Sequence, residues 1–341
     1  MTTDSTSAAP RLDVVGIGNA LVDVLSHESD DFVTAHDLSR GAMTLIDTVR
    51  AESLYAAMGP GREVSGGSAA NSMVGVVSFG GTAAFVGRVS DDQLGAVFGH
   101  DIRAAGVEFT TAPAAPPSDG GEPTGRCLII VTPDAQRTLN TFLGASAQLG
   151  PADLDHELIG RAQVLFLEGY LWDEPEAKDA FRLAARVAHD AGNRVAFTLS
   201  DGFCVDRHRA EFLELVEQDV DVLFANEVEI TSLYEVHSFD DALQRVQHHC
   251  EIAALTRSEK GAVIVARDEI HVVDAYPVPA LVDTTGAGDL FAAGFLYGLT
   301  HGYDLGTAGR LGACAAAEVI SQLGARPDQS LRELAKPLLG E

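Results

Sequence analysis

The stretch from Asp283 to Asp289 (Asp-Thr-Thr-Gly-Ala-Gly-Asp) joins glycines, hydroxyls and two carboxylates to an apolar run long enough for a helix. Gly286 and Gly288 lack the β-carbons that would keep a ligand away from the backbone. The amides of these glycines and of Ala287 would lie in the first helical turn, where no carbonyl accepts them, and they favour a bound anion. Asp289 beside that anion could take the proton of a hydroxyl that attacks a phosphoryl group. A capped helix start without a ligand would fit the same residues.

A second glycine-rich segment, Ser65 to Asn71, also leads into a predicted helix, over residues 69–79. Gly66 and Gly67 would let a ligand lie against bare backbone, and Asn71 can both donate and accept hydrogen bonds, as a polyol requires. Close packing of a helix on a strand is the competing explanation for the glycines.

Polar residues gather where predicted strands end, which is where open α/β sheets bind ligands. They are Asn19 and Asp23, Glu168, and Asn226 with Glu229. The last two are three residues apart on one face of a first helical turn, so they could position the water shell of Mg²⁺. A capping box fits the same spacing, and both interpretations can hold together. The polar turn from Thr256 to Gly261 is suited to a nucleotide or is simply a hairpin link.

Composition limits the classes of partner. The chain has 341 residues and a formal net charge of −27, which argues against binding to nucleic acid or to an anionic membrane surface. Its four cysteines are scattered, which fits a reducing cytoplasm. No apolar run approaches membrane-spanning length, and residues 1–10 form a small, polar leader that we expect to be disordered.

The order of the predicted elements indicates two parts. From residue 153 onward, strands alternate with helices, which implies a parallel sheet with helices on both of its faces. Two earlier segments contain strands without long helical periods, and residues 126–132 and 137–143 form a hairpin. We therefore expect a doubly wound α/β domain (residues 11–24, 64–106 and 146–341) and a small β lid (residues 25–63 and 107–145).

Together these motifs resemble the ribokinase/PfkB carbohydrate kinase family, from Val14 to about Pro327. The most specific part is the segment 283–289, supported by Gly66-Gly67 with Asn71 and by Asn226 with Glu229. Within the family, the segments 16–23 and 137–144 look more like the adenosine kinase branch.

The resemblance implies a ribokinase-like fold with a β-sheet lid, ATP and Mg²⁺ as cosubstrates, and often K⁺. It also assigns roles to residues. The catalytic group comprises Asp289 as base, Gly286, Ala287 and Gly288 as anion hole, and Arg137 on the transferring phosphoryl group. The acceptor would contact Asp23, Asn19, Gly66, Gly67, Asn71, Phe142 and Glu168. ATP would contact Asn226, Glu229, Thr256, Ser258, Gly261 and Thr285, with Glu229 reaching Mg²⁺ through water and Asp283 near K⁺.

This sequence departs from the family pattern at two positions. Ser258 replaces a glycine of many relatives, and Ser68 stands where ribokinases usually carry lysine, which counts against ribose as substrate. We predict a monomeric or homodimeric cytoplasmic kinase that phosphorylates the 5′-hydroxyl of a ribosyl compound, with adenosine as first choice. The alternatives are a sugar kinase of the same family and a non-catalytic nucleoside-binding protein. A nucleoside base would need an apolar slot, and the candidate linings are Phe32, Met43, Phe142, Tyr170 and Phe203.

Overall fold

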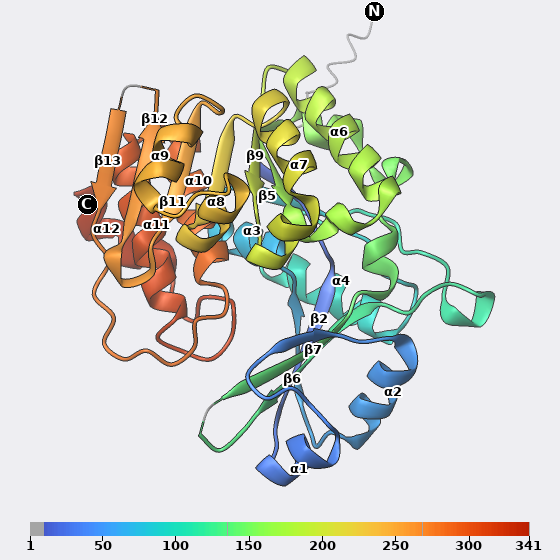
Figure 1. The fold of residues 1–341 in the computed structure, drawn as a ribbon. Coiled ribbons are helices and arrows are strands. Elements are labelled where there is room, and N and C mark those ends of the chain that lie inside the picture. Colours follow the sequence, from blue (N-terminus) through green and yellow to red (C-terminus); the bar gives the residue numbers. More distant parts are fainter. Residues whose placement is uncertain (1–9, 135, 268, 341) are drawn as a thin grey trace, which may run out of the picture.

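The computed structural model describes residues 10–134, 136–267 and 269–340, so the predicted leader lies outside it except for Pro10. Two sheets make up the fold (Figure 1). Within the described ranges, no helix combines the length and apolar character needed to cross a membrane.

The larger sheet has eight strands in the order β13-β12-β11-β10-β9-β8-β1-β5. Their bounds are β1 (Leu12–Ile17), β5 (Ala83–Val86), β8 (Ala162–Glu168), β9 (Arg194–Thr198), β10 (Val222–Asn226), β11 (Ile252–Thr256), β12 (Ala262–Ala266) and β13 (Glu269–Val273). The pairs from β5 to β11 are parallel, while β11–β12 and β12–β13 are antiparallel. All carboxyl ends of β1, β5 and β8 to β11 therefore lie at one edge.

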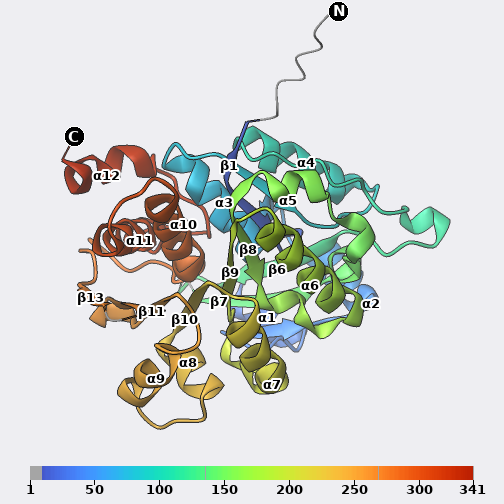
Figure 2. The same cartoon turned by 90° about the horizontal axis from the view of Figure 1, so that it is seen from above.

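Helices cover both faces of this sheet, because the side chains on both faces of parallel strands are buried. Figure 2 shows the two helical layers from above. One face packs on α3 (Ser68–Ser78), α4 (Gln93–Ala104), α10 (Ala287–Thr300), α11 (Leu305–Val319) and α12 (Leu331–Leu339). The other packs on α5 (His156–Gly160), α6 (Pro175–Asp190), α7 (Gly202–Gln218), α8 (Glu227–Leu233) and α9 (Phe239–Val246).

The smaller sheet lies below the larger one in Figure 1 and has the order β3-β7-β6-β2-β4. Its strands are β2 (Leu21–His27), β3 (Met43–Leu45), β4 (Arg62–Gly66), β6 (Gly125–Val131) and β7 (Arg137–Phe142). Two short helices accompany it, α1 (Asp30–Ala35) and α2 (Thr48–Ala57). Val33 of α1 and Leu54 of α2 share a core with Val24 and Ile130, so these helices cover one face of the sheet.

The expected doubly wound, mostly parallel sheet with helices on both faces and a smaller second sheet is confirmed. The predicted 126–132/137–143 hairpin is the antiparallel pair β6–β7. The expectation that residues 25–63 contain strands without helices of note was wrong, because α1 and α2 both lie there, capped by the side chains of Ser29 and Asp47. The strands β2 and β4 run across the expected domain boundaries at 24/25 and 63/64. The division into two domains remains a proposal.

Candidate active site

The 283–289 stretch forms the start of α10, as its glycines predict. Gly286 is the N-cap and has a φ of +79°, in the left-handed region that a side chain would strain. A β-carbon there would also lie 2.7 Å from the backbone of Ala325. The first bond of the helix runs from the Leu290 amide to the Gly286 carbonyl, at 2.9 Å. The Ala287 amide donates to the Thr284 carbonyl at 3.3 Å, so the expectation that no carbonyl accepts the amides of this loop was wrong for Ala287. The amides of Gly288 and Asp289 belong to the first turn, where an anion can bind.

Asp289 lies in this first turn, and side chains of α3 hold both oxygens of its carboxylate. The Ser68 hydroxyl donates to Oδ1 at 2.6 Å and the Asn71 amide donates to Oδ2 at 3.0 Å. Burial raises the pKa of Asp289, and these two hydrogen bonds oppose the rise. A carboxylate whose proton affinity is raised, fixed in the first turn of a helix, has the character of a general base.

The start of α3 depends on Gly67 and on a buried carboxylate. Gly67 has a φ of +103°, and a β-carbon at this position would collide with the carbonyl of Asn19. Glu168, at the end of β8, accepts hydrogen bonds from the Asn19 side chain at 3.0 Å and from the Ala69 amide at 2.8 Å. Burial raises the pKa of Glu168 to about 7. Glu168 thus links the end of β1 to the start of α3, and its oxygens are occupied by protein donors.

Asp23 lies on β2 directly beside β4. A β-carbon at Gly66 would come within 2.5 Å of the Asp23 carboxylate, so this glycine makes room for it. Burial raises the pKa of Asp23 to about 6. The nearby guanidinium groups of Arg326 and Arg137 oppose that rise, and the Asp289 charge adds to it. The structure therefore brings Asp23 close to the carboxylate of α10, although the two are far apart in sequence.

Arg137, at the start of β7, reaches across to the anion loop. Its Nη1 lies 2.7 Å from Asp283 Oδ2 and 3.3 Å from the Thr285 hydroxyl, and both ion-pair side chains are buried. Asp283 also accepts from the Thr285 hydroxyl at 2.8 Å and from the Gly324 amide at 3.0 Å. The Arg137 Nε and Nη2 atoms are buried and have no hydrogen-bond partner among the described residues. Two donors of this cation are thus left for an anion such as a phosphoryl group.

The residues predicted for the nucleotide lie at the ends of β10 and β11. Asn226 and Glu229 form a reciprocal capping box at the start of α8, with bonds of 2.6 to 2.9 Å. Burial raises the pKa of Glu229 to about 7. The capping interpretation of this pair is correct. A buried carboxylate at the rim of the sheet also has the oxygen chemistry that a hydrated Mg²⁺ prefers, so the pair fits that ion through water.

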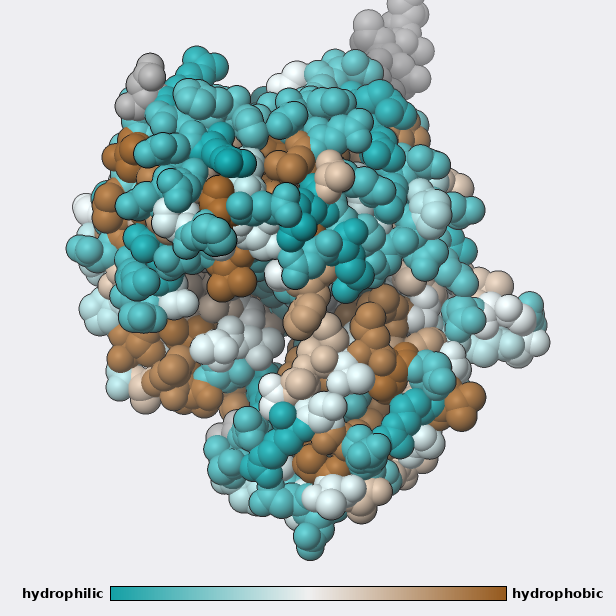
Figure 3. All heavy atoms as spheres, viewed as in Figure 1, coloured by the Kyte–Doolittle hydropathy of each residue, from teal (hydrophilic) through white to brown (hydrophobic). Residues whose placement is uncertain are grey.

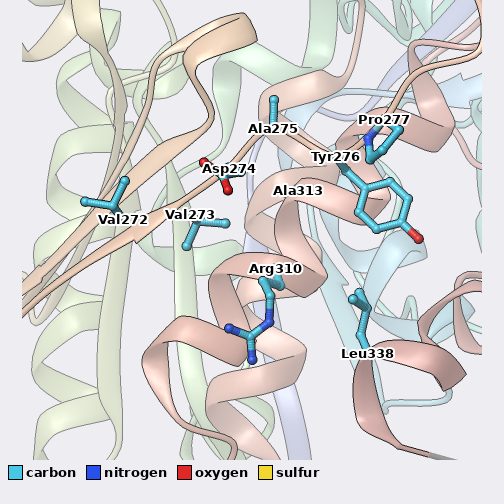
Figure 4. Close-up of a pocket in the computed structure, with 9 residues that line it drawn as sticks. All are labelled: Val272, Val273, Asp274, Ala275, Tyr276, Pro277, Arg310, Ala313 and Leu338. Carbon is cyan, nitrogen blue, oxygen red and sulfur yellow. The ribbon is translucent and has the colours of Figure 1, made fainter.

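The turn after β11 packs against the segment that follows β13. Ser258 and Gly261 have φ values of +52° and +79°, and a β-carbon at Gly261 would collide with the Val273 carbonyl. A cavity of about 310 Å³ opens along that segment. Figure 4 shows its lining by Asp274, Ala275, Tyr276 and Pro277 after β13, with Arg310 and Ala313 of α11 behind.

The structure does not bring all candidate acceptor residues together. Phe142 pairs with Arg126 across β6–β7, whereas Asp23 pairs with Cys127 and belongs to the opposite face of the smaller sheet. Phe32 packs into the core near α1, also away from Asp23. Of the remaining candidates, Met43 is 46% exposed, Phe203 is 75% exposed and Tyr170 is half-buried. Figure 3 shows a hollow between the smaller sheet and the large domain.

Sequence reasoning missed two groups of this site. Ser68 was noted only as a departure from the family pattern, yet it contacts the Asp289 carboxylate. Arg326, in the loop after α11, contacts Asn71 and Asp101 through different nitrogens. Its only sequence signal is an arginine in a Gly-Ala-Arg-Pro turn, which does not point to a partner far away in the chain.

Comparison with known proteins agrees with this geometry. The sequence model of the pfkB family carbohydrate kinases matches residues 42–331. The chain belongs to this family. It is therefore a kinase, a phosphotransferase whose acceptor is a hydroxyl group.

The relatives carry different names. The 5-dehydro-2-deoxygluconokinase of Geobacillus thermodenitrificans is 27% identical over 267 residues, covering 75% of this chain and 78% of the relative. A fructokinase of Escherichia coli is 30% identical over 241 residues, covering 69% and 76%. Among solved structures, the adenosine kinase from Sinorhizobium meliloti is 50% identical, with a TM-score of 0.88 and coverage of 96% and 99%. The acceptor is therefore a sugar or a nucleoside.

Proposed function

We propose that this kinase transfers the γ-phosphoryl group of ATP to the 5′-hydroxyl of a ribosyl compound, with adenosine as the preferred acceptor. The observation that carries the proposal is the environment of Asp289. This carboxylate lies in the first turn of α10 and is held by Ser68 and Asn71. Asp23 and Arg137 come from the smaller sheet to the same place.

In this proposal Asp289 takes the proton of the acceptor hydroxyl as the oxygen attacks phosphorus. The backbone amides of Gly286, Ala287 and Gly288 stabilise charge on the transferring group, and the Ala287 amide exchanges its bond to the Thr284 carbonyl for one to the phosphoryl oxygen. The Arg137 nitrogens that lack a partner among the described residues stabilise the same charge. Asp23, Asn71 and the backbone of Gly66 and Gly67 hold the remaining hydroxyls. Mg²⁺ bound to ATP would neutralise phosphate charge, and Asn226 with Glu229 would hold its water shell. A K⁺ site near Asp283 remains a prediction.

We prefer adenosine over a sugar because apolar side chains share the face of the smaller sheet that carries Asp23. Tyr170 is tied to the end of β9, since its hydroxyl donates to the Ser200 carbonyl at 3.2 Å. Cys127 and Leu139 lie on the Asp23 face of the smaller sheet. The similarity to the Sinorhizobium meliloti adenosine kinase supports the same acceptor.

We also propose that the base of ATP occupies the cavity along residues 272–277. The turn from Thr256 to Gly261 contacts this segment, so the phosphates would pass from the cavity over that turn toward α10. Ala313 lines the cavity. Replacing Ala313 by Phe would fill it and should raise the KM for ATP without changing the KM for the acceptor.

An acceptor panel tests the main proposal. Purified protein is supplied with ATP and Mg²⁺ and with adenosine, ribose, fructose or 5-dehydro-2-deoxygluconate, with and without K⁺, and ADP and the phosphorylated product are measured. We expect the highest kcat/KM with adenosine and formation of adenosine 5′-phosphate. Phosphorylation of fructose but not adenosine would overturn the choice of acceptor. Absence of turnover with every acceptor would contradict the kinase mechanism.

The second candidate is a sugar kinase. It is favoured by two curated relatives, a deoxygluconokinase and a fructokinase, which match 75% and 69% of the chain. Both candidates share Asp289 and the anion loop, and they differ in the groups around the hollow. The cytoplasmic location and the monomeric or homodimeric state remain predictions.

A further inference from the structure

Arg326 is a cation at the acceptor side of the site, and no motif of the sequence points to it. It follows α11 in the segment Gly324-Ala325-Arg326-Pro327. Its side chain is 15% exposed. Nε donates to the Asn71 Oδ1 atom at 3.4 Å, Nη1 lies 3.1 Å from Asp101 Oδ2, and Nη2 is buried without a partner within the described ranges.

The contact with Asn71 determines which way that amide points. An Asn side chain has one acceptor and one donor end, and exchanging them reverses every hydrogen bond it makes. Here the oxygen faces the Arg326 guanidinium, which can only donate, so the nitrogen must face the Asp289 carboxylate, which accepts it at 3.0 Å. Reversing the amide would place its oxygen against the carboxylate and its nitrogen against the cation.

Arg326 is itself anchored from the opposite side. Asp101 of α4 accepts from Arg326 and also from the Ser65 amide, at 2.8 Å, and hydroxyl, at 2.5 Å. The Arg326 carbonyl accepts from the Gln322 side chain at 2.7 Å. These contacts join α4, the loop after α11, α3 and α10 in one chain of hydrogen bonds that ends on Asp289.

We propose that Arg326 is a positioning residue of the phosphoryl transfer, which orients the Asn71 amide and through it the Asp289 carboxylate. This inference rests on the proposed function, in which Asp289 is the base and Asn71 contacts the acceptor. Arg326 touches neither reacting group. It acts by keeping one donor on the base and one amide orientation toward the acceptor.

The first test is a double-mutant cycle. Arg326→Met, Asn71→Ala and the double variant are assayed with the acceptor that the wild type phosphorylates best. Loss of positioning should lower kcat/KM for the acceptor by roughly 10- to 100-fold in Arg326→Met, with the KM for ATP unchanged. Because Arg326 acts through Asn71, the double variant should be no worse than Asn71→Ala. Losses that multiply in the double variant would overturn the proposal.

Two further variants separate positioning from stability. Arg326→Lys can keep an ion pair with Asp101 but offers one nitrogen in place of two, so it should fold like the wild type and still lose kcat/KM. Wild-type kcat/KM in Arg326→Lys would overturn the role of the Asn71 contact. Arg161→Met is the matched control, because it removes an ion pair of similar length and burial.

In that pair Arg161 and Glu108 lie 3.3 Å apart, and their side chains are 20% and 37% exposed. Arg326 and Asp101 lie 3.1 Å apart, and their side chains are 15% and 39% exposed.

Arg161 precedes β8, at the end of the strand away from the site, so its variant should match Arg326→Met in thermal stability but keep wild-type kcat/KM. Equal losses of activity in the two variants would reduce Arg326 to a structural residue. Since every comparison uses an acceptor already phosphorylated by the wild type, these outcomes are distinct from failure of the proposed acceptor or of the kinase activity itself.

Discussion

The acceptor side and the nucleotide side of this site are built in opposite ways. On the nucleotide side the polar groups satisfy one another over short stretches, as Asn226 and Glu229 do in their capping box and as Glu227 does with Arg257. On the acceptor side the groups come from distant segments, and the Nε and Nη2 atoms of Arg137 have no partner among the described residues. The difference indicates that the acceptor side holds its charges ready for a reacting group, while the nucleotide side is complete in itself and offers mainly a surface.

Asp289→Asn, on the acceptor side, should have the largest effect and is the strongest test of this difference. Without a base, kcat should fall by roughly 10²- to 10⁴-fold, because that is the usual contribution of a positioned base, while the KM for ATP changes little. Steady-state kinetics with both substrates measures this. The control is Asp304→Asn, which alters the carboxylate that caps α11. A variant at Asp289 that retains most of its turnover would remove this residue from the chemistry.

Arg137→Met should have the next largest effect. It removes the cation whose Nε and Nη2 have no partner in the part of the chain that the structure describes, so kcat should fall by roughly 10²- to 10³-fold, as for loss of one preorganised charge-stabilising donor. Arg126→Met is the matched control, since Arg126 is a buried arginine on the opposite face of the same sheet, near Tyr55 and Phe142. Equal effects of the two variants on kcat would show that Arg137 stabilises the smaller sheet and does not act on the transferring group.

Ser68→Ala should have a moderate effect on turnover. It removes one hydrogen bond from the Asp289 carboxylate, and kcat should fall by about 3- to 10-fold, the equivalent of one hydrogen bond. That bond lowers the pKa of Asp289, so the acid limb of the kcat/KM profile should move to higher pH in the variant. Ser72→Ala, which loses a bond to the Asp289 backbone carbonyl instead, should leave that limb in place. An unmoved limb in Ser68→Ala would contradict the contact.

Glu229→Gln should affect turnover least and stability most visibly. Burial raises the pKa of Glu229 from 4.5 to about 7, so its native state binds a proton more tightly than the unfolded chain. The contribution of Glu229 to the free energy of unfolding of the wild type is therefore fully present below pH 4.5, and it is lost as the pH rises to about 7. The free energy of unfolding of the variant, relative to wild type, should rise by about 1–3 kcal/mol between pH 5 and pH 8.

Urea unfolding at the two pH values measures this change. Glu227→Gln is the control, because the Arg257 ion pair lowers the pKa of Glu227, and its removal should give no such gain. A Glu229→Gln protein whose relative stability is the same at both pH values would mean that this carboxyl titrates normally.

Local motifs of this site could be predicted from the sequence, and contacts between distant segments could not. The glycines of 283–289 and the Asn226–Glu229 spacing determine helix starts within a few residues, so the fold places them as expected. Phe142 was a wrong candidate for the acceptor site. The face of the smaller sheet on which its side chain lies depends on the register of β7 with β6, and the residue types alone do not determine that register. The helices α1 and α2 are too short for an apolar period to stand out, although their caps are present in the sequence.

The crossing between the two sheets has a mechanical consequence. Gly18 to Ala20 leads from β1 into β2, and Gly66-Gly67 leads from β4 back into α3. Asp23 therefore sits close to the pivot, whereas Met43 sits on the far edge strand β3. Displacement in a rotation grows with distance from its axis, so tilting the smaller sheet would sweep Met43 through a wide arc and scarcely shift Asp23. Such a motion would open the site to a bulky group while Asp23 keeps its position relative to the small hydroxyls of the acceptor.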